Sequence, residues 1–155
     1  MSYTMDMRKI VGHAPIFMPA SGCFLYCNGK IGLQLRTDNH KWAAHGGSME
    51  FGEKPEDTLK REVREELGID ITKSRLLGVY AGEGGHFFYP NGDEVYAVTP
   101  FYLVTEYLGT INPDPTEVVA VEWFALDQLP AKSEINQADY EALQDAIKYI
   151  QENKI

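Results

Sequence analysis

The chain has 155 residues, 44% of them hydrophobic and 24% charged, and this balance is typical of a folded protein and excludes wholesale disorder. Its 14 basic residues against 23 acidic ones give a formal net charge of −9, which argues against binding along a nucleic-acid backbone, because such binding relies on clustered basic residues. No apolar run approaches the roughly 18–20 residues of a membrane span, and residues 1–17 lack the pattern of a signal peptide, so we expect a cytoplasmic protein without a membrane segment.

Two strands and a loop are expected in the first third of the chain. The strands cover about residues 16–27 and 31–36. The dipeptide Asn28-Gly29 between them is a strong hairpin signal, because the tightest hairpin turns need positive φ at both central positions. Residues 37–47 are expected to follow as a loop.

An amphipathic helix is expected next, over residues 55–67. Pro55 suits the first helical position, and Gly68 suits the cap after the last turn, because glycine readily adopts the left-handed conformation found there. Apolar residues recur at every fourth position and predict the buried stripe of this helix: Leu59, Val63 and Leu67.

Strands return in the middle of the chain, and a second amphipathic helix ends it. One strand is expected within residues 74–83, a pair within 85–109 that turns at residues 90–93, and a further strand over 118–126. The final helix is expected over about residues 135–152. Strands joined mostly as hairpins, with two separated helices, predict an α/β fold in which helices cover the faces of a mixed sheet.

Three glutamates crowd one face of the first expected helix. Glu62, Glu65 and Glu66 stand at positions i, i+3 and i+4, and like charges at these spacings destabilise a helix by about 0.2–0.5 kcal/mol per pair. Three carboxylates on one face form a hard-oxygen site suited to Mg²⁺ or Mn²⁺. The alternative is a solvated helix face on which Arg61 and Arg64 balance the glutamates.

The spacing around these glutamates favours the metal site, because it resembles the box that defines the Nudix hydrolase family. In residues 47–69, Gly47 is followed after five intervening residues by Glu53 and after seven more by the pair Arg61-Glu62. The remaining defining positions are filled by Val63, Glu65, Glu66, Gly68 and Ile69.

The resemblance implies one Nudix hydrolase domain over residues 1–155, with its box at 47–69, folded as an α/β/α sandwich with a mixed β-sheet between helices. It implies a MutT-like or ADP-ribose pyrophosphatase-like enzyme that uses Mg²⁺ or Mn²⁺ to cleave the phosphoanhydride bond of a nucleoside diphosphate linked to another group, with ADP-ribose-like compounds first. Two alternatives stay open: a nucleoside triphosphatase that cleans the nucleotide pool, and a catalytically silent nucleotide-binding module. The expected partner is a small nucleotide, and a homodimer is compatible with the resemblance.

The resemblance also implies roles for particular residues. It implies these metal ligands: Glu62, Glu65, Glu66 and the backbone carbonyl of Gly46. Arg61 is expected to orient the glutamates, and Glu53 to support the loop before the helix. The general base stays open between a box glutamate, Glu117 and Glu94.

Four further residues carry weaker signals. Arg36 ends a strand where similar proteins place a phosphate-facing arginine, and a solvated charge is the alternative. Tyr89 lies in an aromatic segment whose rings could stack on a nucleobase, although aromatic residues in strands more often belong to the core. His45 stands where many family members have proline and is interpreted as a loop histidine or as an imidazole near the metal. Lys54 leaves the start of the helix without a strong side-chain cap.

Overall fold

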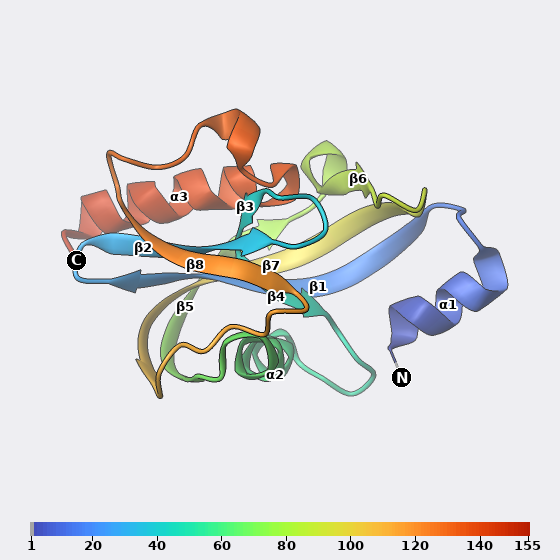
Figure 1. The fold of residues 1–155 in the computed structure, drawn as a ribbon, viewed down its shortest axis with the longest axis horizontal. Coiled ribbons are helices and arrows are strands. Elements are labelled where there is room, and N and C mark those ends of the chain that lie inside the picture. The colour runs from blue at the N-terminus through green and yellow to red at the C-terminus, as the bar shows by residue number, and fades with distance from the viewer. Residues whose placement is uncertain (1) are drawn as a thin grey trace.

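The computed structural model describes residues 2–155, and a twisted β-sheet lies between two of its helices (Figure 1). The helices are α1 (Tyr3–Val11), α2 (Pro55–Leu67) and α3 (Gln137–Asn153), with short 3-10 helices η1 (Gly82–Gly85) and η2 (Lys132–Glu134). The strands are β1 (Ile16–Cys27), β2 (Lys30–Arg36), β3 (Trp42–Ala43), β4 (His45–Ser48), β5 (Asp70–Tyr80), β6 (His86–Phe88), β7 (Glu94–Leu108) and β8 (Val118–Ala125). None of the helices described in residues 2–155 is long and apolar enough to cross a membrane.

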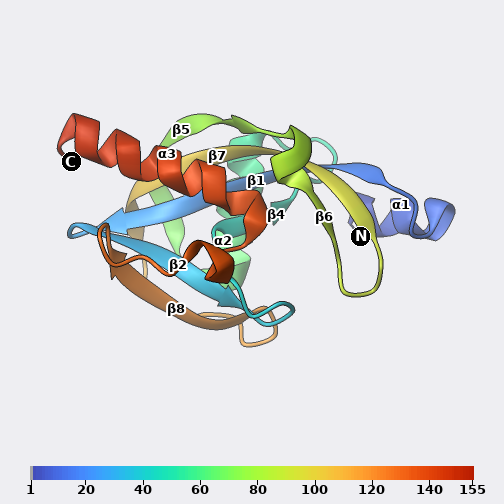
Figure 2. The ribbon, with the colours of Figure 1, turned by 90° about the horizontal axis from the view of Figure 1, so that it is seen from above.

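The sheet is mixed, as the sequence predicts. Its main path runs β3-β2-β1-β7-β5, and β4, β6 and β8 pair with β1, β7 and β2 respectively. The pairing of β1 with β7 is parallel, whereas the other strand pairs are antiparallel. Helices α2 and α3 cover opposite faces, and α1 lies at one end of the molecule beside the start of β1 (Figures 1 and 2). The predicted α/β/α sandwich is therefore confirmed.

Each face of the sheet has its own apolar cluster, because successive residues of a strand point to opposite faces. In β1, Phe24 packs into the cluster that contains α3, and Leu25 packs into the cluster that contains α2. The predicted stripe of α2 is fully buried at Leu59, Val63 and Leu67. Burying one such side chain contributes about 1.5–3 kcal/mol, so this stripe holds α2 against the sheet.

Several predicted elements differ from the observed ones. Helix α1 is absent from the sequence prediction; it is nine residues long and none of its described residues is buried. The expected loop over 37–47 contains β3 and most of β4, whose sequence His-Gly-Gly-Ser lacks a strand pattern and forms a strand by pairing with β1. Strand β5 begins at Asp70 rather than Ser74, because pairing with β7 extends it through mostly exposed residues.

Candidate active site

A pocket of about 480 Å³ opens between β1, β4, the box helix α2 and the start of α3, a size typical of small-molecule sites. One group of lining side chains, near the box helix, is acidic and includes Glu62, Glu66 and Glu117. A second group is aromatic and includes Phe87 and Tyr89. The pocket therefore combines carboxylate oxygens with flat apolar surfaces.

Two glycines of β4 permit close approaches, Gly46 to strand β1 and Gly47 to the box helix. A Cβ at Gly46 would lie 2.0 Å from the carbonyl oxygen of Ser21, and the residue has a φ of 140°, so a side chain is excluded there. A Cβ at Gly47 would lie 2.5 Å from the carboxyl carbon of Glu62. The backbone N–H of Gly46 donates to Oε2 of Glu66 at 3.2 Å. The glycines thus bring the backbone of β4 into contact with two box carboxylates.

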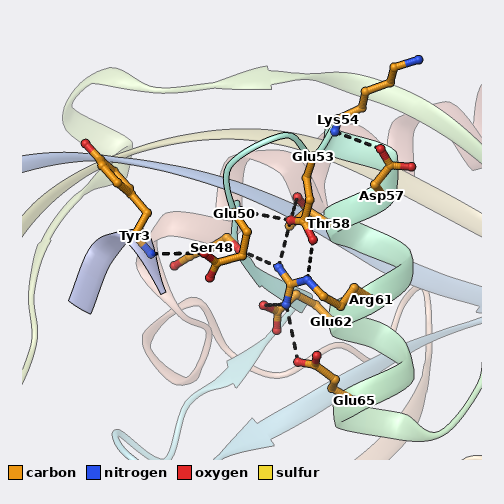
Figure 3. Close-up of polar contacts among 10 residues, drawn as sticks. All are labelled: Tyr3, Ser48, Glu50, Glu53, Lys54, Asp57, Thr58, Arg61, Glu62 and Glu65. Atoms are coloured by element: carbon orange, nitrogen blue, oxygen red, sulfur yellow. Dashed lines mark hydrogen bonds and ion pairs between the residues drawn. The ribbon is translucent and has the colours of Figure 1, made fainter. Parts of the chain in front are cut away.

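Arg61 holds these elements together (Figure 3). Its Nε and Nη2 donate to the two carboxylate oxygens of Glu53 at 2.6 and 3.0 Å, and Nη2 also donates to the carbonyl of Ser48 at 3.0 Å. Its Nη1 donates to Glu62 at 2.7 Å. The hydrogen bond from Arg61 lowers the pKa of Glu53 to about 2. Arg61 therefore links the loop before α2, strand β4 and Glu62.

The loop before α2 is also tied to Glu53. Oε2 of Glu53 accepts hydrogen bonds from the backbone N–H of Glu50 at 3.0 Å and from Oγ1 of Thr58 at 2.7 Å. The helix start is capped from within, because the carboxylate of Asp57 accepts the backbone N–H of Lys54 at 3.0 Å (Figure 3). The side chain of Lys54 supplies no cap, as predicted. The carboxylate of Asp57, which accepts the backbone N–H of Lys54, is the side-chain cap at this end of the helix.

The acidic group brings three carboxylates to one side of the pocket, where Glu66 is buried, Glu62 is partly buried and Glu117 is exposed. Burial raises the pKa of Glu66 to about 8, and the nearby carboxylates of Glu62 and Glu117 add to the shift, whereas the N–H of Gly46 opposes it. Burial also raises the pKa of Glu62, although Arg61 opposes that shift. Without a cation, the pocket therefore favours a protonated Glu66 near neutral pH.

Glu117 reaches the pocket because its loop caps the end of α2. The backbone N–H of Asn112 donates to the carbonyl of Leu67, and that of Asp114 donates to the carbonyl of Glu66, both at 2.8 Å. These bonds satisfy carbonyls that a helix end leaves without partners. The loop that then leads into β8 places Glu117 among the lining residues.

The structure separates the third box glutamate from the other two. The side chain of Glu65 is 61% exposed and lies 3.5 Å from Arg61, outside the described lining of the pocket. Among residues 2–155, no group of three or more His, Cys, Asp or Glu side chains is gathered closely enough to hold a metal ion. The donor types of Glu62, Glu66 and Glu117 nevertheless fit Mg²⁺ or Mn²⁺, because they are hard oxygens whose mutual repulsion a divalent cation relieves.

Of the two later carboxylates considered as a general base, only Glu117 is a lining residue of the described pocket. Glu94 is at the start of β7, where its Oε1 lies 2.8 Å from Nε2 of His86. The geometry therefore favours Glu117 over Glu94 for a role in this pocket.

Arg36 and Tyr89 both line the pocket, as expected for substrate contacts. Nε and Nη2 of Arg36 donate to the carboxylate of Asp38 at 2.8 and 2.6 Å. The hydroxyl of Tyr89 donates to Sδ of Met18 at 3.7 Å, and its ring packs edge to face on Phe87 with centroids 5.3 Å apart. Burial raises the pKa of Tyr89.

Comparison with known proteins completes the assignment of the family. A sequence model of the NUDIX domain matches residues 16–146. This chain belongs to the Nudix family. The Nudix box at 47–69 thus lies within the matched segment, and the pocket formed around its helix is the candidate active site of a Nudix fold.

Individual relatives agree with the family assignment. The uncharacterized Nudix hydrolase YvcI of Bacillus subtilis is 29% identical over 111 residues, which are 70% of this chain and 66% of that protein. The 8-oxo-dGTP diphosphatase of Proteus vulgaris is 39% identical over 66 residues, or 43% of this chain and 52% of that protein. The chain thus spans less than two thirds of either relative. The crystal structure of a MutT NUDIX hydrolase from Burkholderia pseudomallei has a TM-score of 0.71 and 29% identity, covering 84% of this chain and 98% of the other.

His45, just before the Nudix box, lies in strand β4 rather than in a loop, so that part of its interpretation is wrong. The side chain is completely buried, with Nε2 3.0 Å from the carbonyl oxygen of Gly32 and Nδ1 3.3 Å from Oε1 of Gln34. Burial lowers the pKa of His45 to about 4, so the ring is neutral at pH 7. Its position in the pocket wall is therefore held by protein contacts on both ring nitrogens.

Sequence reasoning missed the polar residues that α3 contributes to this Nudix pocket. Asn136 and Asp139 line it, and the buried carboxylate of Asp139 accepts the N–H of Ala44 at 3.0 Å and Nδ2 of Asn136 at 3.1 Å. Burial raises the pKa of Asp139. The Asn-x-x-Asp spacing marks a helix start in the sequence, but only the folded chain shows that this start meets β3 and β4.

Replacing Gly47 by alanine is expected to lower kcat/KM at least tenfold while stability changes little. The added Cβ would meet the carboxylate of Glu62, the movable end of a side chain, so the carboxylate shifts and the fold does not. Steady-state kinetics and thermal melting measure the two effects. The control is Gly84→Ala, where a Cβ meets nothing closer than 3.7 Å. Unchanged kinetics of Gly47→Ala would contradict the placement of Glu62.

The metal-free protein is expected to lose stability, relative to Glu66→Gln, as the pH rises from about 5 to 8. The pKa of Glu66 is about 8 in the folded protein against an ordinary 4.5, so the unfolded chain releases this proton first, and the stabilising contribution disappears as the pH rises through the folded value. The contribution of His45 is common to both proteins and cancels. Thermal melts across this pH range measure the difference, and a difference that does not vary with pH would contradict the buried state of Glu66.

Proposed function

We propose that this Nudix protein hydrolyses a phosphoanhydride bond of a nucleotide and that Glu62 and Glu66 hold the divalent cation that the reaction requires. The observation that supports this most strongly is the buried Glu66 beside two further carboxylates in the pocket wall. A buried ionised carboxylate is costly without a cation, so packing alone does not account for Glu66 at this position. Glu65 is proposed as an outer contributor, since its carboxylate is exposed and held only loosely by Arg61.

The side chains divide the work of the reaction. Arg61 keeps Glu62 and Glu53 in place, so the box carboxylates and the loop before α2 move as one unit. When bound, Mg²⁺ or Mn²⁺ offsets charge on the phosphoryl oxygens and makes an associated water more acidic. Glu117, which belongs to another segment, is proposed as the group that takes the proton of the attacking water.

The other side of the pocket supplies substrate contacts. The guanidinium of Arg36 carries donors suited to a phosphate group, and its bond with Asp38 holds it in the pocket wall. Phe87 and Tyr89 present rings on which a nucleobase can stack. These contacts support a nucleotide substrate, and we propose a nucleoside diphosphate linked to another group, with ADP-ribose-like compounds first.

A nucleoside triphosphate is the second candidate substrate. The relative from Proteus vulgaris is named as an 8-oxo-dGTP diphosphatase, and it is 39% identical over a segment that covers 43% of this chain. The two candidates differ in their products: a linked diphosphate yields two phosphorylated products, and a triphosphate yields a monophosphate and pyrophosphate.

An activity screen tests the proposal. Purified protein is incubated with ADP-ribose, other diphosphate-linked nucleosides, the common nucleoside triphosphates and 8-oxo-dGTP, each with and without Mg²⁺, and the products are separated. Hydrolysis that depends on Mg²⁺ supports the enzyme, and the products identify the substrate class. Nucleotide binding without turnover would instead support a silent Nudix module.

A further inference from the structure

Helix α1 precedes the segment that matches the Nudix family, which begins at residue 16. None of its nine residues, all of them described, is buried, and a helix of this length is marginal on its own in water. Specific contacts at its two ends therefore contribute to fixing its position. Both ends contact segments that lead directly to the candidate active site.

Arg8 anchors the C-terminal end of α1 to the turn between β6 and β7. Its Nη1 donates to the carbonyls of Gly12 and Ala14 at 3.0 and 2.7 Å, and its Nη2 donates to the carbonyl of Glu94 at 2.7 Å. Its Nε lies 3.4 Å from Oδ2 of Asp93, and only 10% of the arginine side chain is exposed. A planar fork of donors makes all these contacts, which a lysine ammonium cannot reproduce.

The turn that Arg8 binds is hydrogen-bonded to Tyr89, which forms the aromatic wall of the pocket together with Phe87. The backbone N–H of Tyr89 donates to the carbonyl of Asp93 at 2.8 Å, and the N–H of Gly92 donates to the carbonyl of Tyr89 at 2.9 Å. Tyr89 and Phe87 pack against each other and both line the pocket, whereas Arg8 is not among its described lining residues. Arg8 therefore reaches the site only through the turn.

The N-terminal end of α1 contacts the loop before the box helix (Figure 3). The backbone N–H of Tyr3 donates to Oε2 of Glu50 at 3.2 Å, and its ring packs edge to face on Phe51 with centroids 5.1 Å apart. The N–H of Glu50 in turn donates to Glu53, which binds Arg61. One short helix thus bridges the loop on the carboxylate side of the pocket and the turn on its aromatic side.

We propose that α1 is a positioning element of the substrate site, in which Arg8 holds the turn over residues 89–93, and with it Tyr89, against the pocket while Tyr3 holds the loop that carries Glu53. The substrate in this proposal is the nucleotide of the proposed function. Removing the Arg8 side chain releases the turn that positions Tyr89, but it leaves the hydrogen bonds of the box glutamates with Arg61 and Gly46 unchanged. It therefore weakens nucleotide binding more than it slows the chemical step.

The variant Arg8→Met tests this with the nucleotide that is hydrolysed fastest in the activity screen. KM is expected to rise about tenfold, the effect of losing a charged hydrogen bond, while kcat stays within about twofold. Amide hydrogen exchange over residues 86–94 is expected to become faster, and Arg8→Lys is expected to recover part of both effects. The matched control is Ile10→Ala on the same helix, because that side chain is 79% exposed and belongs to neither anchor.

An unchanged KM, a loss confined to kcat, or unchanged exchange over residues 86–94 would overturn the proposal. If no nucleotide is hydrolysed, the dissociation constant of ADP with Mg²⁺ and the exchange rates give the same comparison, so a failure of the proposed function remains distinguishable. If Arg8→Met does not fold, Asp93→Asn replaces it, since this change removes the charged partner and leaves the carbonyl acceptors of Arg8. A smaller rise in KM is then expected, and no rise would overturn the proposal.

Discussion

Replacing Glu66 by glutamine is expected to lower kcat/KM by about a thousandfold while the protein stays folded. The side chain is 5% exposed, lies in the pocket wall and has two other carboxylates nearby. Glutamine has the same shape and still accepts the N–H of Gly46, so the fold is retained. It carries no negative charge, and the site loses much of its attraction for a divalent cation. Steady-state kinetics with Mg²⁺ and circular dichroism melts measure both parts.

Two further glutamates serve as comparisons for this variant. Glu106→Gln is expected to behave as the unaltered protein, because Glu106 is 63% exposed and pairs with Lys73 at 3.6 Å. Glu65→Gln is expected to cost less than Glu66→Gln, since Glu65 lies outside the described pocket lining. A Glu66→Gln protein that retains more than about a tenth of its activity with the same metal requirement would contradict the account.

Arg61→Met is expected to lower the free energy of unfolding by about 2 kcal/mol and kcat/KM by about a hundredfold. Methionine keeps much of the side-chain length but removes every hydrogen bond of the guanidinium. Glu53, whose side chain is 18% exposed, then loses its charged partner, and the carbonyl of Ser48 loses a donor. Glu62 also loses its positive neighbour. Chemical denaturation and steady-state kinetics measure the two losses.

The control for Arg61→Met lies one turn away on the same helix. Arg64 is 70% exposed and pairs with Asp70 at the surface, so Arg64→Met is expected to change stability by less than about 1 kcal/mol and to leave kcat/KM unchanged. Arg61→Lys keeps the charge but not the fork, and it is expected to recover only part of the activity. Equal effects of Arg61→Met and Arg64→Met would contradict the positioning role of Arg61.

The elements that the sequence predicted correctly are those that local chemistry specifies. Helix α2 has a proline at its start, a glycine at its end and an apolar residue at every fourth position, and these signals act within one turn or two. The hairpin at Asn28-Gly29 is confirmed by φ values of 51° and 75°. In each case the local sequence was enough to predict the element, without information on residues distant in the chain.

The elements that were missed depend on contacts across the fold. Strand β4 contains two glycines and becomes a strand only through its pairing with β1, and α1 is fixed by end contacts with segments more than 40 residues away. The residues of the candidate active site divide in the same way, into those that local spacing predicts and those that only contacts across the fold bring in. The positions of Glu62 and Glu66 follow from helical spacing, whereas Asp139 enters the pocket because the start of α3 is bonded to Ala44, between β3 and β4.

The arrangement of the box glutamates shows the limit of periodicity. Spacing alone places Glu65 on the same helix face as Glu62 and Glu66, yet Glu65 is exposed and Glu66 is buried. The sheet meets the helix at the glycines of β4, and this contact selects which carboxylates face the pocket. Glu117 takes its place beside them because its loop caps the helix end, a feature with no signal in the box itself.

Anomalous diffraction from crystals soaked in Mn²⁺ tests the central claim most directly. We expect a peak in the pocket within bonding distance of the carboxylates of Glu62 and Glu66, and a much weaker peak in crystals of Glu66→Gln. A fully occupied Mn²⁺ elsewhere in a protein that hydrolyses nucleotides, or an equal peak in both crystals, would contradict it.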